Sequence, residues 1–217
     1  LLKYIKKNKV KVFRLPVQSK NPLLILLNII LITLIIILLR IDIVHARSRA
    51  PAWSCLISCI ITRAKFVTTF HGIYNFSNQL KKFYNSVMVR SNLVIAGSNY
   101  VFDHIHKNYG QLLDSKKRLL VIFRGINTEY FDNSNITTNK VRELQKLLSL
   151  KSEKFTILLP GRLTKWKGQE IFIEALNLLR EKYKKKDFQA IILGSHQGRK
   201  VYYKKLISMV EKYRLKN

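Results

Sequence analysis

Short apolar runs alternate with helical patterns along most of the chain. The runs are rich in Val, Ile, Leu and Phe, and they lie at residues 10–17, 41–46, 65–70, 93–96, 119–123, 155–159 and 188–193. Helical patterns separate them, at residues 22–39, 51–62, 78–90, 100–108, 169–183 and 199–213. Because most runs are continuously apolar, they predict parallel strands covered on both faces. The alternation therefore predicts an α/β fold with a doubly wound parallel sheet.

Residues 132–152 differ in composition from the apolar runs on either side. They contain Asn-Ser-Asn-Ile-Thr-Thr-Asn, followed by a charged amphipathic stretch. We predict a domain junction here, with residues 1–135 in an N-terminal domain and residues 136–217 in the first part of a C-terminal domain. The second domain then contains two predicted strands, which is at most half of a Rossmann-like domain.

The stretch 23–39 is apolar at every position except Asn28 and Thr33. At about 1.5 Å per residue a helix of this length spans roughly 25 Å, which is marginal for crossing a bilayer. Arg40 and Asp42 follow at once, and a strand pattern begins without a loop. We interpret the stretch as a crossover helix lying on the sheet. A helix that also dips into a membrane surface and a true membrane span are the alternatives.

The chain is strongly basic, with 40 Lys and Arg against 12 Asp and Glu and a formal net charge of +28. Such an excess attracts phosphate in nucleic acid, in lipid headgroups or in a phosphorylated small molecule. AT-rich coding also produces Lys-rich sequences, so the charge alone does not identify a partner. No nucleic-acid module is recognisable, and we expect no nucleic-acid partner; a basic nucleic-acid-binding protein is kept as a distant alternative. Cys55 and Cys59 predict two buried thiols in a reducing compartment rather than a disulfide framework or a zinc site.

A basic turn at residues 160–168 carries the strongest local signal. Its sequence, Pro-Gly-Arg-Leu-Thr-Lys-Trp-Lys-Gly, follows the predicted strand 155–159 and precedes a predicted helix. A helix N-terminus presents free backbone amides, and anions bind there readily. Gly161 and Gly168 allow close approach of the backbone, while Arg162 and Lys167 supply charge for phosphate oxygens. We predict a phosphate site here, although a basic turn can also be merely a solvated loop.

Polar residues and glycines follow several other predicted strands. His45, His71-Gly72, Ser98, Arg124-Gly125 and Gly194-Ser195 all stand at or just after the end of an apolar run. Open α/β sheets bind ligands at the carboxyl ends of their strands. A lone histidine is more often structural, but the repetition of this pattern favours a shared ligand cleft.

Several motifs, taken in order, resemble those of family 4 glycosyltransferases. The motifs are Asp-Ile-Val-His-Ala-Arg-Ser-Arg-Ala-Pro-Ala-Trp (42–53), Thr-Phe-His-Gly (69–72), Val-Ile-Ala-Gly-Ser (94–98), Val-Ile-Phe-Arg-Gly-Ile-Asn (121–127) and Gly-Arg…Lys-Gly (161–168). The resemblance covers nearly the whole chain. It implies a GT-B fold, in which two Rossmann-like domains face each other across a cleft and the second domain is truncated here. It also implies a hexosyltransferase-type enzyme.

The resemblance implies specific roles for these residues. Arg162 and Lys167 would hold the diphosphate of a nucleotide-sugar donor and act in catalysis with His71, which would lie near the transferred sugar. Donor-binding residues would also include Gly161, Gly168, Gly194 and Ser195. Residues of the acceptor side and the cleft would be His45, Ser48, Arg49, Gly72, Ser98, Arg124, Gly125 and Asn127, although the family usually has Asp at the position of Asn127. No cofactor and no metal ion are expected.

The resemblance to bacterial members implies synthesis of lipopolysaccharide or a related surface glycan, with a glycan or lipid-linked acceptor. We therefore expect a cytoplasmic protein held peripherally on the anionic inner face of the plasma membrane. The N-terminal Gly-rich turn and the later Glu-x7-Glu motif of the family are not found, which predicts a fragment lacking both ends and inactive alone. An inactive remnant of a split or decayed gene is the alternative.

Overall fold

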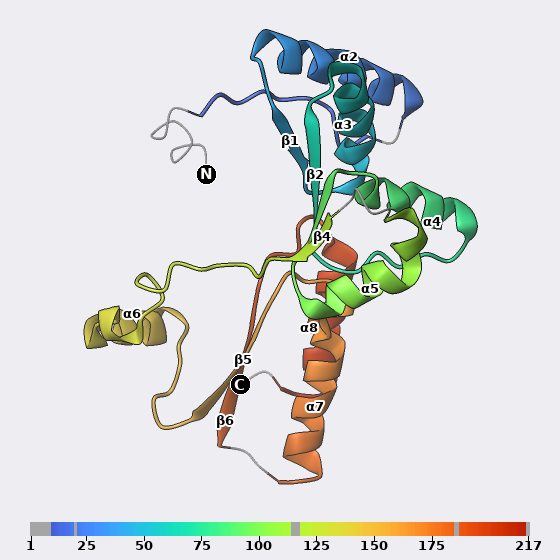
Figure 1. The fold of residues 1–217 in the computed structure, drawn as a ribbon. Helices are drawn as coiled ribbons and strands as arrows, with labels where there is room; N and C mark the ends of the chain where they lie inside the picture. Colours follow the sequence, from blue (N-terminus) through green and yellow to red (C-terminus); the bar gives the residue numbers. More distant parts are fainter. Residues whose placement is uncertain (1–9, 20, 114–117, 185–186, 216–217) are drawn as a thin grey trace. The chain divides into compact units, whose positions relative to one another are not determined.

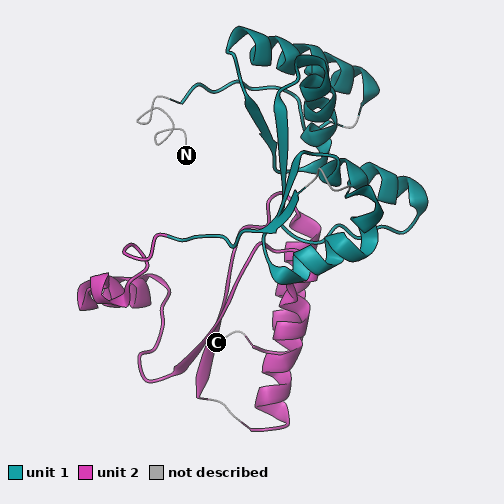
Figure 2. Cartoon of the chain, in the orientation of Figure 1, with its two compact units in different colours: residues 1–126 teal, residues 127–217 magenta. Residues whose placement is uncertain are grey.

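The computed structural model describes residues 10–19, 21–113, 118–184 and 187–215. The chain divides into two compact units, which are coloured separately in Figure 2. Unit 1 is Leu1–Ile126 and unit 2 is Asn127–Asn217. The junction predicted after residue 135 lies inside unit 2, directly after the short 3-10 helix η3 (Asn133–Asn135).

Unit 1 contains a parallel sheet of four strands. The strands are β1 (Ile43–Ala46), β2 (Lys65–Phe70), β3 (Leu93–Ala96) and β4 (Arg118–Val121), and they are neighbours in that order (Figure 1). The connecting helices are α3 (Arg49–Thr62), α4 (Gln79–Ser86) followed by the 3-10 helix η1 (Val87–Val89), and α5 (Asn99–Tyr109) followed by η2 (Gly110–Leu112). All four strands end at the same edge of the sheet, which is where the predicted cleft residues of unit 1 lie.

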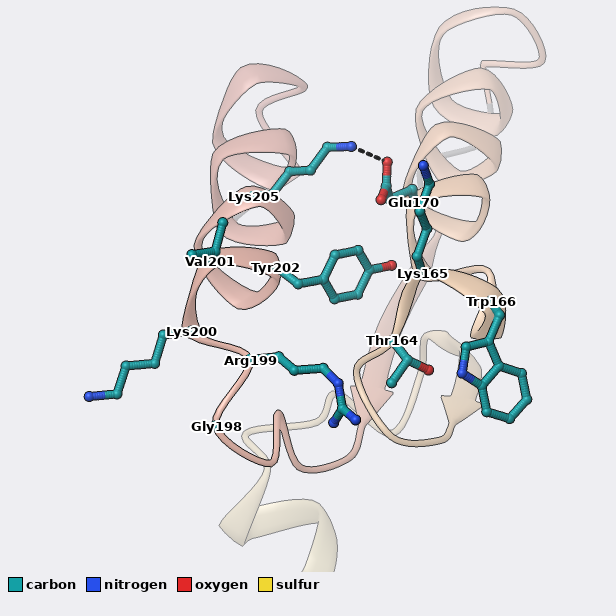
Figure 3. A pocket seen from close by; sticks show the side chains of 10 residues that line it. All are labelled: Thr164, Lys165, Trp166, Glu170, Gly198, Arg199, Lys200, Val201, Tyr202 and Lys205. Carbon is teal, nitrogen blue, oxygen red and sulfur yellow. Dashed lines mark hydrogen bonds and ion pairs between the residues drawn. The ribbon is translucent and has the colours of Figure 1, made fainter. Parts of the chain in front are cut away.

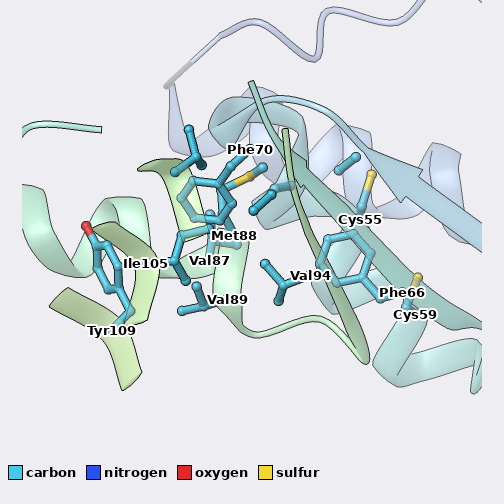
Figure 4. Packing of buried hydrophobic residues seen from close by; sticks show 14 of the residues in the cluster. Cys55, Cys59, Phe66, Phe70, Val87, Met88, Val89, Val94, Ile105 and Tyr109 are labelled. Carbon is cyan, nitrogen blue, oxygen red and sulfur yellow. The ribbon is translucent and has the colours of Figure 1, made fainter. Parts of the chain in front are cut away.

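The core of unit 1 lies between the sheet and its helices. Phe66 and Phe70 of β2 pack with Val94 of β3 and with the apolar segment Val87–Val89 (Figure 4). Cys55 and Cys59 face the same core from α3, and both are free thiols. Burial raises the pKa of Cys55 to about 12 and that of Cys59 to about 11. The prediction of two buried thiols is confirmed.

Helix α2 (Pro22–Leu38) packs side by side with α3. The Asn21 side chain caps its first turn, and Pro22 stands where the missing N–H costs nothing. Small residues of α3 allow the close contact, because the hydroxyls of Ser54 and Ser58 donate hydrogen bonds to the carbonyls of Ile25 and Ile29. In the part of the chain that the structure describes, no helix is long and apolar enough to cross a membrane.

Unit 2 contains a parallel pair of strands, β5 (Phe155–Pro160) and β6 (Phe188–Leu193). Its helices are α6 (Thr138–Leu147), α7 (Gln169–Glu181) and α8 (Lys200–Lys212), with the 3-10 turn η4 (Lys165–Lys167) before α7. Helix α6 falls in the charged amphipathic stretch, to which no helix was assigned from the sequence. The core of unit 2 is small, with Leu163, Ile173 and Leu206 as its buried centre.

One of the predicted strands is wrong. Residues 10–17 form no strand, and Val10, Val12 and Phe13 are each about half exposed. The alternation of Val and Lys has the composition of a strand, but a strand also needs a hydrogen-bonded neighbour, and none of the described strands pairs with this segment. The other predicted strands are present, and the expected α/β architecture with parallel sheets is confirmed.

Candidate functional site

The loop from β5 to α7 has a fixed backbone. Gly168 ends it with a φ of 76°, a left-handed conformation that favours glycine, and α7 begins at the next residue. Gln169 is fully buried beneath the loop, and its Nε2 donates a 2.9 Å hydrogen bond to the carbonyl of Arg162. The hydroxyl of Tyr202 in α8 donates to Oε1 of Gln169 at 3.3 Å. The backbone that carries Arg162 is therefore supported from inside unit 2.

The ends of β5 and β6 approach each other closely at Gly194. A Cβ atom at this position would lie 1.9 Å from the carbonyl oxygen of Gly161, so no other residue fits without moving the backbone. Two hydrogen bonds join the strand ends: Gly161 donates to the carbonyl of Leu193 at 2.8 Å, and Leu163 donates to that of Ser195 at 3.1 Å. Gly194 thus holds the basic loop against β6, and Ser195 contributes through its backbone carbonyl.

Three cations project from this loop around an exposed tryptophan. Trp166 is 69% exposed, with Nζ of Lys167 at 4.4 Å and Cζ of Arg162 at 5.9 Å from its ring centroid. Lys165 is also exposed. Within the described part of the chain, no carboxylate forms an ion pair with Arg162 or Lys167. Their charges are therefore available to an anion, and the ring of Trp166 lies in contact range of both.

A cavity of about 730 Å³ adjoins the loop (Figure 3). Its lining comprises Thr164, Lys165, Trp166, Glu170, Gly198, Arg199, Lys200, Val201, Tyr202 and Lys205. Tyr202 extends from α8 towards α7 in the close-up, and Lys205 forms an ion pair with Glu170. The volume lies in the range of small-molecule sites. Arg162 and Lys167 do not line the cavity themselves, but they contact Trp166, which does.

In unit 1, basic side chains gather at the carboxyl edge of the sheet. Nε2 of His45 lies 2.7 Å from the hydroxyl of Thr69, across neighbouring strands. Nε of Arg47 donates a 2.8 Å hydrogen bond to Nε2 of His71. Arg124, which follows β4, donates to the backbone carbonyl of His71 at 3.1 Å. The predicted grouping of His45, His71 and Arg124 at one edge is therefore present within this unit.

This edge favours neutral histidines. Partial burial lowers the pKa of His71, and the positive charges of Arg47 and Arg124 lower it further, with a smaller contribution from His45. The pKa of His45 is lowered by partial burial and by Arg47. Because Nε2 of His71 accepts the hydrogen bond from Arg47, the proton of the neutral ring is on Nδ1. Nδ1 is buried and has no hydrogen-bond partner among the described residues.

Two predicted cleft residues make contacts within the fold. The hydroxyl of Ser98 accepts a 3.3 Å hydrogen bond from the backbone N–H of Val101 and caps α5. Nη1 of Arg49 donates to Oδ1 of Asn85 at 2.6 Å, and its guanidinium lies 4.4 Å from the ring centroid of Tyr74. Both residues therefore stabilise the elements that carry the carboxyl edge of the sheet.

The remaining predicted cleft residues have few contacts. Oδ1 of Asn127 accepts a 2.9 Å hydrogen bond from the backbone of Tyr130, as in a turn. Ser48 precedes α3 but makes no capping hydrogen bond with its side chain. A Cβ atom at Gly72 or Gly125 would meet nothing within 4 Å, so local packing does not demand glycine there.

Reasoning from the sequence missed Arg47 and Gln169. Arg47 directly follows the last residue of β1, so its position at a strand end could have identified it. Gln169 is the first residue of α7 and is buried, which no pattern of polar and apolar residues indicates. Across the described residues, no group of three or more His, Cys, Asp and Glu side chains could hold a metal ion.

Comparison with protein families identifies the chain. The model of glycosyltransferase family 4 matches residues 5–130, and the model of glycosyl transferases group 1 matches residues 140–217. The chain belongs to glycosyltransferase family 4. The two matches correspond closely to the two compact units of this family 4 protein. A comparison with curated proteins found no match.

Solved structures with the same fold include a glycosyltransferase and the protein HepE. A glycosyltransferase from Rickettsia africae ESF-5 is 38% identical, with a TM-score of 0.80, over 100% of this chain and 55% of that one. HepE from Anabaena, in complex with UDP and glucose, is 20% identical, with a TM-score of 0.77, over 100% of this chain and 56% of that one. This family 4 chain thus has the predicted GT-B fold and spans little more than half the length of both relatives.

Proposed function

We propose that the protein transfers a sugar from a nucleotide-sugar donor to a glycan or lipid-linked acceptor, in the synthesis of lipopolysaccharide or another cell-surface glycan. The observation that carries this proposal is the pair of cations, Arg162 and Lys167, on a braced loop beside the cavity of unit 2. Membership of glycosyltransferase family 4 supports the reaction class.

In this proposal the donor diphosphate lies against the loop. The planar guanidinium of Arg162 can grip two phosphate oxygens, and Lys167 adds a second charge. The N-terminus of α7 contributes backbone N–H groups and the positive end of the helix dipole. As the bond between the sugar and the diphosphate breaks, negative charge grows on the leaving nucleoside diphosphate. Fixed cations stabilise that charge more in the transition state than in the ground state.

The acceptor hydroxyl attacks the anomeric carbon and forms the new glycosidic bond, while the bond to the diphosphate breaks and the proton of the hydroxyl passes to an oxygen of the departing nucleoside diphosphate. We assign His71 to the transferred sugar, where a neutral imidazole can hydrogen-bond a hydroxyl group. The lowered pKa of His71 supports this role, because it keeps the ring uncharged near neutral pH. Arg47 and Arg124 then act as positioning residues, since they hold the ring and the backbone of His71.

The donor nucleotide can be probed with UDP, because HepE was crystallised with UDP and glucose. We expect calorimetry to detect UDP binding to the full chain, and Arg162→Ala and Lys167→Ala each to weaken it at least about tenfold. A hydrogen bond to a charged group contributes roughly 1.5–3 kcal/mol, and about 1.4 kcal/mol is a factor of ten. Since side chains supply the charge, a chelator should leave the affinity unchanged.

The matched control removes two lysines of unit 2 outside the cavity lining, Lys146→Ala with Lys151→Ala. This variant changes the net charge by the same amount as Arg162→Ala with Lys167→Ala. If both double variants weaken UDP binding equally, only the overall charge matters, and the proposed donor site is wrong.

We further propose that the protein works on the inner face of the plasma membrane, where lipid-linked acceptors would be reached.

A further inference from the structure

The carboxyl edge of the sheet in unit 1 carries positive charge that the fold does not neutralise. Unit 1 contains 20 Lys and Arg against three aspartates and no glutamate. Asp42 precedes β1 and therefore stands at the opposite edge of the sheet, while Asp103 lies on α5. Asp114 lies outside the described residues. None of the described carboxylates forms an ion pair with an arginine of unit 1.

Two arginines of this edge are each held by one hydrogen bond to His71. Arg47, which follows β1, uses Nε for its 2.8 Å bond to the His71 ring. Arg124, which follows β4, uses Nη2 for its 3.1 Å bond to the His71 carbonyl. Both side chains are exposed. In the part of the chain that the structure describes, no acceptor is bound by Nη1 or Nη2 of Arg47 or by Nε or Nη1 of Arg124. Each guanidinium is therefore oriented and still has two nitrogens available to a ligand.

Glycine at the end of β3 leaves room for the side chain of Arg124. Gly97 directly follows β3, and a Cβ atom there would lie 4.0 Å from Nε of Arg124 and 3.3 Å from the carbonyl oxygen of Phe70. Arg124 therefore passes the end of β3 on its way to His71, which follows β2. Since β1 is the neighbour of β2 on the other side, Arg47 and Arg124 reach His71 from opposite directions along the sheet.

Holding two arginines at one histidine without a carboxylate costs electrostatic free energy. Like charges repel, and the two guanidiniums lower the pKa of His71 beyond the effect of its burial. Uncharged donors would hold the ring and the carbonyl of His71 equally well, so positioning alone does not call for two charges. Carboxylate and phosphate groups are the usual partners of guanidinium groups, because their oxygens match the planar fork of donors.

We propose that the acceptor is anionic, and that Arg47 and Arg124 bind a carboxylate or phosphate group on it beside His71. This inference rests on the proposed function, in which Arg162 and Lys167 of unit 2 already supply the cations for the donor diphosphate. The two arginines of unit 1 then determine specificity. A neutral acceptor leaves their charges without a partner, whereas an acidic sugar or a sugar phosphate neutralises them.

The test follows the His71 ring in the full chain by NMR, with UDP present to occupy the donor site. The probes are glucuronate, glucose 1-phosphate and methyl glucoside, which share a hexose and differ in charge. The chain has five histidines, and His71→Gln identifies the Cε1 proton signal of His71. We expect glucuronate or glucose 1-phosphate to shift this signal with a dissociation constant at least about tenfold below that of methyl glucoside. The bound anion should also raise the pKa of His71, because it offsets the two arginines.

Two double variants remove the same charge from opposite edges of the sheet. Arg47→Gln with Arg124→Gln keeps an uncharged donor at both positions, and we expect it to bind the charged probes as weakly as methyl glucoside. The matched control, Lys65→Gln with Arg118→Gln, changes the first residues of β2 and β4, which lie at the amino edge. Because salt screens charges at that distance, the control should retain the affinity for charged probes to within about twofold. Circular dichroism checks that both variants are folded.

The outcomes separate the anion site from its alternatives. Equal binding of all three probes to the original chain would overturn the inference, and this comparison needs no variant. The inference is also wrong if both double variants lose affinity for the charged probes equally, since only the overall charge would then matter. Tighter binding of glucuronate assigns the anion to an acidic sugar, and tighter binding of glucose 1-phosphate assigns it to a phosphate; both results support the inference.

The proposed function can fail separately from this inference. If UDP does not bind the chain while a charged probe binds at His71, only the donor site in unit 2 is wrong. If UDP binds as expected and the three probes are not discriminated, only the anionic acceptor is wrong.

Discussion

Replacing Gly194 with alanine should disrupt the loop between β5 and α7 (residues 161–168), which we call the donor loop, without removing any charged group. The added Cβ atom would lie 1.9 Å from the carbonyl oxygen of Gly161 and 2.7 Å from its carbonyl carbon. Real Cβ atoms do not approach closer than 3.0 Å, so the two backbones must separate by at least the difference, 1.1 Å. That movement lengthens and weakens the two hydrogen bonds that join the ends of β5 and β6.

The expected loss of stability in unit 2 is about 3–5 kcal/mol. Overpacking costs roughly 1–3 kcal/mol, and two weakened backbone hydrogen bonds cost about 1 kcal/mol each. UDP affinity should fall as well, because Arg162 directly follows the displaced Gly161. Gly161→Ala is the matched control for stability. Its Cβ atom would meet only the Lys167 side chain, at 3.7 Å, which is ordinary contact.

Tryptophan fluorescence during urea unfolding can report on unit 2 alone. The chain has two tryptophans, Trp53 in unit 1 and Trp166 in unit 2, so a Trp53→Phe background leaves one probe, in unit 2. Equal unfolding free energies for Gly194→Ala and Gly161→Ala in this background would refute the reasoning about the close strand ends. A normal UDP affinity in folded Gly194→Ala would refute the link from Gly194 to the donor loop.

Three further predictions concern unit 1. Because the pKa values of His45 and His71 are lowered in the fold, their contribution to stability is present above the unfolded pKa of about 6.5 and is lost as pH falls through the folded values. The urea midpoint should therefore fall on acidification, and less so in His71→Gln; equal slopes would contradict this. Cys55 and Cys59 should react slowly with a thiol reagent until urea unfolds the chain, and rapid labelling of the folded protein would contradict their burial. Phe70→Ala should cost about 3–5 kcal/mol of unfolding free energy because Phe70 is fully buried, while Phe123→Ala, at an exposed residue, should cost little; similar losses would refute the assigned core.

The apolar runs predicted most of the fold because buried parallel strands leave a continuous hydrophobic signal. The segment 10–17 has a similar composition but no neighbouring strand, and pairing depends on residues far away in the sequence. Helix α6 was missed because its short, charged pattern resembles a linker, although Thr137 caps it. Local sequence patterns therefore do not predict which strands pair over long distances in the chain, and they miss short polar helices.

Strand-end position identified much of the candidate site. It identified His45, His71 and Arg124, because parallel strands end at a common edge of the sheet. It could not distinguish a ligand contact from an internal one, so Ser98 and Arg49 were grouped with these residues although they cap a helix and bridge two helices. Gln169 was missed because its role depends on its being buried, and nothing in the sequence indicates that a polar residue such as this glutamine is buried.

The small core of unit 2 has a consequence for how tightly a nucleotide can bind. Leu163, Ile173 and Leu206 form its buried centre, and the described part of unit 2 has one pair of strands, whose stability depends on the helices packed against it. Because fewer side chains are buried in unit 2 than in unit 1, we expect local opening of β5 and β6 to require less free energy than opening of β2 and β3, and each opening removes the donor loop from its bound shape. The measured dissociation constant is the intrinsic one divided by the closed fraction, so a nucleotide that binds must also close the unit. Amide hydrogens of β5 and β6 should accordingly exchange faster than those of β2 and β3, and they should slow most when UDP is added.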